Sequence, residues 1–313
     1  MNLVWYRNDL RVHAHRALQQ ALSQGGPVIA VYCLCEQQWD AHEVAPLRRW
    51  YVLQSLLELG DALAARGVDL HVLDAGDFAA VPAMLADFAS ENDVEHIFCS
   101  REYPLNELNR DRAVARVLEP QGVGITGYDD SVLVPPRTLN TGKGTPYTVF
   151  SAYKKRWDVW LDSHFQPVPP LPEKRHGKGH FVGRTTVDAA LKTLTVADSL
   201  TRHWQPGESA ALKQLDHFVE HHLAGHILRE CRDTRCCHAM VSCKDGEPAC
   251  VRARRQGFLD LRDLNSKRFD PPQRANWFGF AVDCCANLSF KLRFRMGCIR
   301  ICRCLHDEEC PFT

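Results

Sequence analysis

Short, wholly apolar runs alternate with amphipathic stretches throughout residues 1–134, and this alternation limits the fold more than any other feature of the sequence. A run that is apolar throughout is typical of a strand buried on both faces, as in a parallel sheet. Strands that alternate with helices form right-handed βαβ units. We therefore predict a Rossmann-like α/β domain with a doubly wound, mostly parallel, five-stranded sheet. Its strands are predicted at 3–6, 27–34, 69–75, 96–100 and 124–134.

Helical periodicity is clearest in two segments, 46–67 and 208–225. In the first, Gly67 stands where a helix commonly ends, and the apolar face is Leu53, Leu56, Leu57 and Leu63. In the second, the apolar face is Leu212, Leu215, Phe218, Val219 and Leu223. Residues 165–183 hold four prolines and three glycines, which predicts a linker without regular structure.

The N-terminal stretch MNLVWYRNDLR becomes charged after a short apolar run. Neither a secretory signal nor a membrane-spanning segment has that pattern. We expect a cytoplasmic protein with no membrane partner.

Polar side chains follow the first predicted strand: Arg7, Asn8, Asp9 and Arg11. Ligands of doubly wound sheets bind beyond the carboxyl ends of the strands, so these residues could border a cleft. A simpler interpretation is a turn in which Asp9 or Asn8 caps the next helix. These residues alone favour the turn.

Two histidine pairs, His217/His221 and His222/His226, have the four-residue spacing that metal ligands on a helix use. Glu220 directly precedes His221, which does not fit the H-E-x-x-H pattern of zinc hydrolases. The sequence favours a polar helix face, and we assign no metal site from it.

Four ordered stretches resemble the N-terminal domain of DNA photolyases and cryptochromes. They are WYRNDLR after the first strand, REYPLNELNRD (101–111), GYDDSVLVPP (127–136) and GKGTPYTVFSAYKKRW (142–157). WQPGESAALKQLDHF (204–218) is also similar to the first helix of that family's flavin-binding half. The resemblance implies an α/β antenna domain (1–135), an interdomain linker (136–203), and the first helix of a flavin-binding domain (204–225).

The resemblance to the folate-antenna branch implies that Asn106 and Glu107 contact the pterin of 5,10-methenyltetrahydrofolate. A carboxylate can accept two parallel hydrogen bonds from the ring N–H and the exocyclic amine of a pterin. The residues alone also allow Asn106 to cap a helix and Glu107 to lie in its first turn. Relatives that use a deazaflavin antenna share most of these motifs. Arg7 and Asp9 are expected to shape the cleft without touching the pterin.

The family reaction is the light-driven reversal of cyclobutane pyrimidine dimers in damaged DNA by reduced FAD. Arg232 and Asp233 match the Arg-Asp pair of the flavin site, but no T-S-x-L-S-P stretch follows them. We therefore expect a chain that holds the antenna, does not bind FAD stoichiometrically and does not repair DNA. We also expect a monomer. The alternative is a non-catalytic, cryptochrome-like light sensor. A generic nucleotide-binding module fits less well, because it does not explain 101–111 and 142–157.

The composition changes near position 226. Residues 1–225 hold three cysteines and a net charge of −5, whereas 226–313 hold eleven cysteines and a net charge of +5. Paired C-x2-C spacing, the strong signal for zinc, is absent from the sequence. A reducing compartment disfavours disulfides, and interspersed acidic residues weaken the case for a nucleic-acid-binding tail. Our hypothesis is that the residues from about 226 onward are translated from a shifted reading frame. Translation of the DNA in the other two frames would test it, because one of them should then encode a T-S-x-L-S-P stretch.

Overall fold

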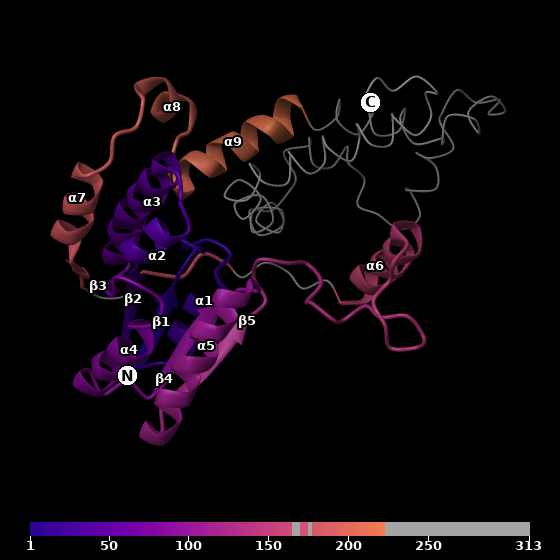
Figure 1. Ribbon diagram of the computed structural model, residues 1–313, viewed down its shortest axis with the longest axis horizontal. Coiled ribbons are helices and arrows are strands. Elements are labelled where there is room, and N and C mark those ends of the chain that lie inside the picture. The colour runs from indigo at the N-terminus through magenta and orange to yellow at the C-terminus, as the bar shows by residue number, and fades with distance from the viewer. Residues whose placement is uncertain (165–169, 175–176, 223–313) are drawn as a thin grey trace.

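The computed structural model describes residues 1–164, 170–174 and 177–222 (Figure 1). Its centre is a sheet in the order β5-β4-β1-β2-β3-β6, in which every pair of neighbouring strands is parallel. The strands are β1 (Asn2–Tyr6), β2 (Val28–Leu34), β3 (Asp69–Asp74), β4 (His96–Ser100), β5 (Gly124–Tyr128) and β6 (Phe181–Val182). The five predicted strands and their parallel arrangement are confirmed.

Helices cover both faces of the sheet, as a doubly wound fold requires (Figure 1). They are α1 (Arg16–Ser23), α2 (Glu36–Ala41), α3 (Pro46–Ala64), α4 (Val81–Glu91), α5 (Leu105–Leu118), α6 (Phe150–His164), α7 (Arg184–Lys192), α8 (Asp198–His203) and α9 (Glu208–His221). The side chains of alternate residues of β1 pack into two separate hydrophobic cores, one on each face of the sheet. Val4 and Tyr6 pack with residues of α1 and α3, and Leu3 and Trp5 pack with residues of α4 and α5. The strand is therefore apolar throughout because both of its faces are covered.

The sheet has a sixth strand within the segment predicted to be a linker. Phe181 and Val182 pair with Leu70 and His71 at the outer edge of β3. The aromatic ring of Phe181 lies where a Cβ on Gly60 of α3 would be, so this approach requires the glycine. The expectation that 165–183 contains no regular element is therefore wrong. The strand could not be recognised in the sequence, because two residues are too few to show a periodic pattern.

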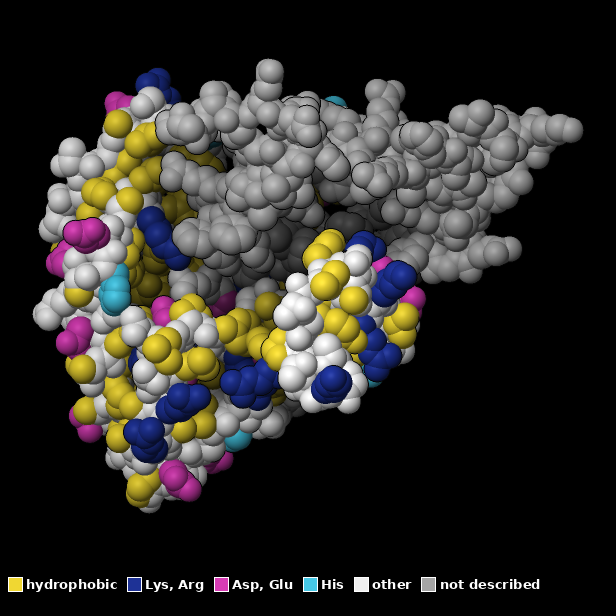
Figure 2. Space-filling model, turned by 45° about the vertical axis from the view of Figure 1, so that its right-hand side comes forward, with side chains coloured by type: hydrophobic (Ala, Val, Ile, Leu, Met, Phe, Trp, Pro, Cys, Tyr) yellow, Lys and Arg dark blue, Asp and Glu magenta, His cyan; other side chains and the backbone are white. Residues whose placement is uncertain are grey.

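The rest of 136–203 also contains regular structure. It forms α6, α7 and α8, and α7 buries Val187 and Ala190 against the sheet. By contrast, no side chain of α6 is buried among the described residues. Phe150 is 75% exposed, and Figure 2 shows hydrophobic and basic side chains mixed on the projecting lobe that contains this helix. The segment therefore combines an element docked on the sheet with one that projects from it.

Strand β5 is shorter than predicted and ends at Tyr128 instead of residue 134. The carboxylates that follow it bind other elements: Asp129 accepts hydrogen bonds from Arg101 and Tyr103, and Asp130 accepts one from the backbone N–H of Arg16. Its neighbour β4 ends at Ser100, so no strand remains for residues after Tyr128 to pair with on that side.

The winding direction changes between β1 and β4. From β1 the chain continues to β2 and β3 on one side, then crosses to β4 and β5 on the other. The connections after β1 and β4 therefore leave in opposite directions, and ligands of doubly wound sheets bind beyond the carboxyl ends of such strands. This is the switch point of the sheet.

Several predictions lie outside the described residues. They concern the segment 226–313 with its eleven cysteines, the Arg232-Asp233 pair, Leu223 and His226. Within the described ranges, no helix is long and apolar enough to cross a membrane.

Candidate functional site at the switch point

The loop after β1 is held by its own side chains. The carboxylate of Asp9 accepts hydrogen bonds from the backbone N–H of Arg7 at 2.8 Å and from Nε2 of His15 at 2.7 Å. Nδ1 of His15 accepts a hydrogen bond from the backbone N–H of Leu18 at 3.0 Å, so Nε2 carries the hydrogen. His15 thus caps α1, which begins at Arg16. The interpretation of Asp9 or Asn8 as the cap is wrong, because the helix starts farther along the chain and Asp9 orients its capping histidine.

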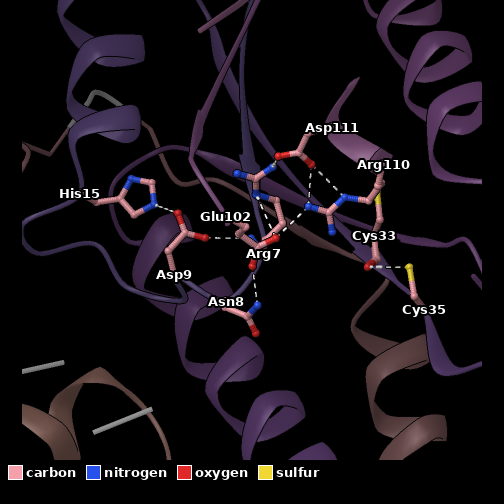
Figure 3. Close-up of polar contacts among 9 residues, drawn as sticks. All are labelled: Arg7, Asn8, Asp9, His15, Cys33, Cys35, Glu102, Arg110 and Asp111. Atoms are coloured by element: carbon pink, nitrogen blue, oxygen red, sulfur yellow. Dashed lines mark hydrogen bonds and ion pairs between the residues drawn. The ribbon is translucent and has the colours of Figure 1, made fainter. Parts of the chain in front are cut away.

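Arg7, Glu102, Arg110 and Asp111 form a cluster of charges with buried arginines and partly buried carboxylates, which we call the switch-point ion cluster (Figure 3). Arg7 donates to Asp111 at 3.1 Å. Arg110 donates to Glu102 at 2.8 Å and to Asp111 at 2.7 Å. Both arginines are more than nine-tenths buried. Such charges must be paired when buried, so the cluster rigidly connects the end of β1 to α5.

An aromatic ring lies under both arginines of this cluster. The guanidinium carbons of Arg7 and Arg110 are 4.5 and 4.8 Å from the ring centroid of Trp5, and Arg110 also lies 4.6 Å from the ring centroid of Phe78. Guanidinium groups are attracted to the faces of aromatic rings at such distances. The last residues of β1 thereby fix the positions of both arginines.

The surroundings control which groups are ionised. Burial alone would raise the pKa of Asp9, but its contact with His15 and the charge of Arg7 hold that pKa well below its ordinary value. Burial and the neighbouring Cys35 raise the pKa of the Cys33 thiol to about 12. Burial likewise raises the pKa of Cys35 to about 12. The carboxylate is charged and the two thiols are neutral near pH 7, so neither thiol is an activated nucleophile.

Asn106 and Glu107 lie in the first turn of α5, directly after β4 and next to the switch point. Asn106 is exposed, and its Nδ2 lies 3.4 Å from Nε2 of His42, the C-cap residue of α2. Pro104 occupies the N-cap position, so the interpretation of Asn106 as the cap is wrong, whereas the first-turn position of Glu107 is confirmed. The sequence missed His42, because no local pattern connects it with a residue 64 positions away.

The side chain of Glu107 is half-buried, and no hydrogen bond or ion pair joins it to the described part of the chain. A carboxylate is favoured near a helix N-terminus, where the helix dipole is positive. It offers two acceptor oxygens, and the amide of Asn106, which precedes it in the same turn and contacts His42, offers a donor. This set can hold the edge of a flat heterocycle with adjacent N–H groups, such as a pterin.

The first residue of α9, Glu208, contacts the loop after β1 although it lies far along the chain from that loop. Glu208 is 8% exposed, and its two carboxylate oxygens accept hydrogen bonds from the backbone N–H groups of Val12 at 2.9 Å and His13 at 2.8 Å. Nδ1 of His13 lies 3.0 Å from the same carboxylate. Glu208 thus attaches the start of α9 to the loop that carries Asp9.

The fold and its strand-end site define a Rossmann-like α/β domain with polar and charged side chains gathered at its switch point. The family model described as DNA photolyase matches residues 2–173, and the chain belongs to the DNA photolyase family. A deoxyribodipyrimidine photo-lyase from Escherichia coli is 36% identical over 221 residues, which cover 70% of this chain and 45% of the relative. The chain thus spans less than half the length of that relative.

Two solved structures have the same fold. A class III photolyase from Agrobacterium tumefaciens gives a TM-score of 0.59 at 22% identity, covering 93% of this chain and 59% of that one. A Synechocystis cryptochrome gives a TM-score of 0.56 at 22% identity, covering 90% of this chain and 59% of that one.

Proposed function

We propose that the described part of the chain is the antenna half of a photolyase-like protein of light-dependent DNA repair. The observation that carries the proposal is the half-buried, unpaired carboxylate of Glu107 in the first turn of α5, directly after Asn106, which contacts His42. A carboxylate so placed gains from a ligand that donates two hydrogen bonds to it.

The ligand proposed is 5,10-methenyltetrahydrofolate. When bound, it would absorb light and pass the excitation energy to FAD. Glu107 would accept hydrogen bonds from the ring N–H and the exocyclic amine of the pterin, and Asn106 and His42 would contact its polar edge. An antenna performs no bond chemistry, so the task of these residues is to bind the pterin and keep it in one orientation.

The switch-point ion cluster supports that task. Arg110 lies on α5 three residues after Glu107, and its pairs with Glu102 and Asp111 fix the first turns of this helix. The cluster is therefore proposed to keep the Glu107 carboxylate stationary without touching the ligand.

The whole-protein activity is part of the same proposal. Because relatives of this chain are deoxyribodipyrimidine photo-lyases, we propose damaged DNA as the binding partner. We further propose that the protein is monomeric and cytoplasmic. Because the flavin-binding motifs are missing after position 226, we propose that this chain neither binds FAD stoichiometrically nor repairs DNA. A purified sample with a flavin spectrum and light-dependent dimer repair would refute that part.

The second candidate is a non-catalytic, cryptochrome-like light sensor. Its support is the common fold with the Synechocystis cryptochrome, which equally supports the first candidate. A light-dependent change in hydrogen exchange of the folate-loaded chain, without DNA repair, would favour the sensor.

The experiment that tests the antenna site is a fluorescence titration of the purified chain with 5,10-methenyltetrahydrofolate. Binding of one equivalent is expected, and Glu107→Gln should weaken it roughly tenfold to a hundredfold, because a charge-assisted pair of hydrogen bonds is lost. Glu119→Gln, at the far end of the same helix, is the matched control and should bind like the wild type. Equal binding by both variants would refute the site.

A further inference from the structure

Helix α9 carries exposed histidines over its last turn. The imidazole rings of His217 and His221, four residues apart, are stacked with centroids 4.4 Å apart and an angle of 27° between their planes. Both side chains are exposed. Residues four apart lie on the same face of a helix, so both imidazoles lie next to each other on the surface of α9.

A hydrogen bond to the backbone orients one of these rings. Nδ1 of His221 lies 3.0 Å from the carbonyl oxygen of His217. A carbonyl oxygen only accepts hydrogen bonds, so Nδ1 must donate and the lone pair of the ring is on Nε2. Metal-ligating histidines commonly use one ring nitrogen in this way while the other binds the metal.

We propose that His217 and His221 form a binding site for a divalent transition-metal ion of the Zn²⁺, Ni²⁺ and Cu²⁺ class. Imidazole is a preferred ligand of these ions, whereas Mg²⁺ and Ca²⁺ prefer oxygen ligands. Among the described residues, no group of three or more His, Cys, Asp or Glu side chains is arranged to hold a metal. Within the described part of the chain the site thus has two protein ligands, and water would complete the coordination.

The neighbouring His222 is not part of the site. Its ring centroid lies 5.2 Å from that of His217 and 6.5 Å from that of His221, and its plane is inclined by 68° and 52° to theirs. A solvated polar face, which the sequence favours, accounts for the exposure of all three histidines. The proposed site differs from such a face by having two imidazoles four residues apart, with the lone pair of His221 on Nε2.

Metal binding at this site would have two physical consequences. The ion would bridge positions 217 and 221 and stabilise the C-terminal turn of α9, because it binds only when that turn is formed. Its affinity would fall as the pH is lowered, because the ligand is the neutral imidazole and protons compete with the metal.

Helix α6 contains a matched control histidine. Nδ1 of His164 lies 3.0 Å from the carbonyl oxygen of Trp160, and the two rings stack 4.7 Å apart at an angle of 4°. His164 thus has the same backbone bond and a stacked ring four residues earlier, but that ring belongs to tryptophan and cannot bind a metal. The α9 site differs from it by the second imidazole, and Nδ1 of His164 also lies 2.8 Å from Oγ of Ser163.

The test is a titration of the full chain, labelled with ¹³C at the histidine ε1 carbon, with NiCl₂. Paramagnetic Ni²⁺ broadens the NMR signal of each histidine that it binds, and the signals are assigned with His217→Gln, His221→Gln and His164→Gln. His217 and His221 should broaden together, at a free Ni²⁺ concentration at least roughly tenfold below that for His164, because the second ligand binds intramolecularly. Ni²⁺ taken up by other groups does not affect this ratio, since all signals report on the same free ion.

The single variants decide the outcome. In His217→Gln, the signal of His221 should broaden only at the higher Ni²⁺ concentration that broadens His164. In His221→Gln, the signal of His217 should likewise broaden only at that higher concentration. Glutamine is a good helix former, so α9 is expected to persist in both variants. Broadening of His217 and His221 at the same Ni²⁺ as His164, or an unchanged His221 signal in His217→Gln, would overturn the proposal.

Discussion

Glu208 is the residue whose removal should weaken the link between α9 and the switch-point loop most. Its buried carboxylate accepts hydrogen bonds from the backbone N–H groups of Val12 and His13 at 2.9 and 2.8 Å, and Val12 is 2% exposed. Glu208→Ala leaves one buried donor, on Val12, and one partly buried donor, on His13, without a partner. Hydrogen bonds to charged groups contribute about 1.5–3 kcal/mol each, so the variant should lose about 3–5 kcal/mol of the free energy of unfolding. That loss is large against a typical total of about 5–15 kcal/mol.

The assay is urea unfolding followed by tryptophan fluorescence, combined with amide hydrogen exchange at positions 12 and 13. Glu58→Ala is the control, because Glu58 also accepts a backbone hydrogen bond from α9, from Ser209 at 2.7 Å, but at an exposed site. An exposed interaction of this kind contributes about 0–1 kcal/mol. If Glu208→Ala and Glu58→Ala destabilise equally, or if Val12 and His13 exchange at the wild-type rate in Glu208→Ala, the reasoning is refuted.

Two further variants test the loop after β1 and the sixth strand. Asp9→Asn should cost about 1–3 kcal/mol near pH 7, because it disrupts the buried contact with His15. The pKa of Asp9 is lower in the folded than in the unfolded protein, so its ionised form stabilises the wild type above about pH 4, the unfolded pKa. Acid unfolding curves should show that the advantage of the wild type over Asp9→Asn shrinks as the pH falls below this value. Gly60→Ala places a Cβ against the ring of Phe181 and should lower the free energy of unfolding by about 1–3 kcal/mol, and Gly60→Ala/Phe181→Ala should lose less than the sum of the two single variants.

The sequence predicted the part of the fold that local patterns encode. The run at 96–100 matches β4 to the residue, and the helix over 46–67 is confirmed as α3, with Gly67 in the left-handed conformation just beyond it. Burial on both faces makes such strands apolar throughout, so they stand out from their surroundings. The sheet order explains why Asn106 and Glu107, which follow β4, lie near the loop that follows β1.

Features that depend on contacts distant in sequence could not be predicted. The pairing of Arg7 with Asp111 spans 104 positions, and that of Glu208 with Val12 spans 196. Strand β6 exists because Phe181 packs over Gly60, and its two residues have no pattern of their own. Tertiary packing decides such details, and no local propensity reports on it.

The central claim is that Glu107 belongs to a folate antenna site, and a competition measurement tests it most directly. The purified chain, loaded with one equivalent of 5,10-methenyltetrahydrofolate, is titrated with a deazaflavin while folate fluorescence is followed. The folate should stay bound at equimolar deazaflavin, and Glu107→Gln should bind the folate roughly tenfold to a hundredfold more weakly. Preferential binding of the deazaflavin, with folate affinity unchanged in Glu107→Gln, would contradict the account.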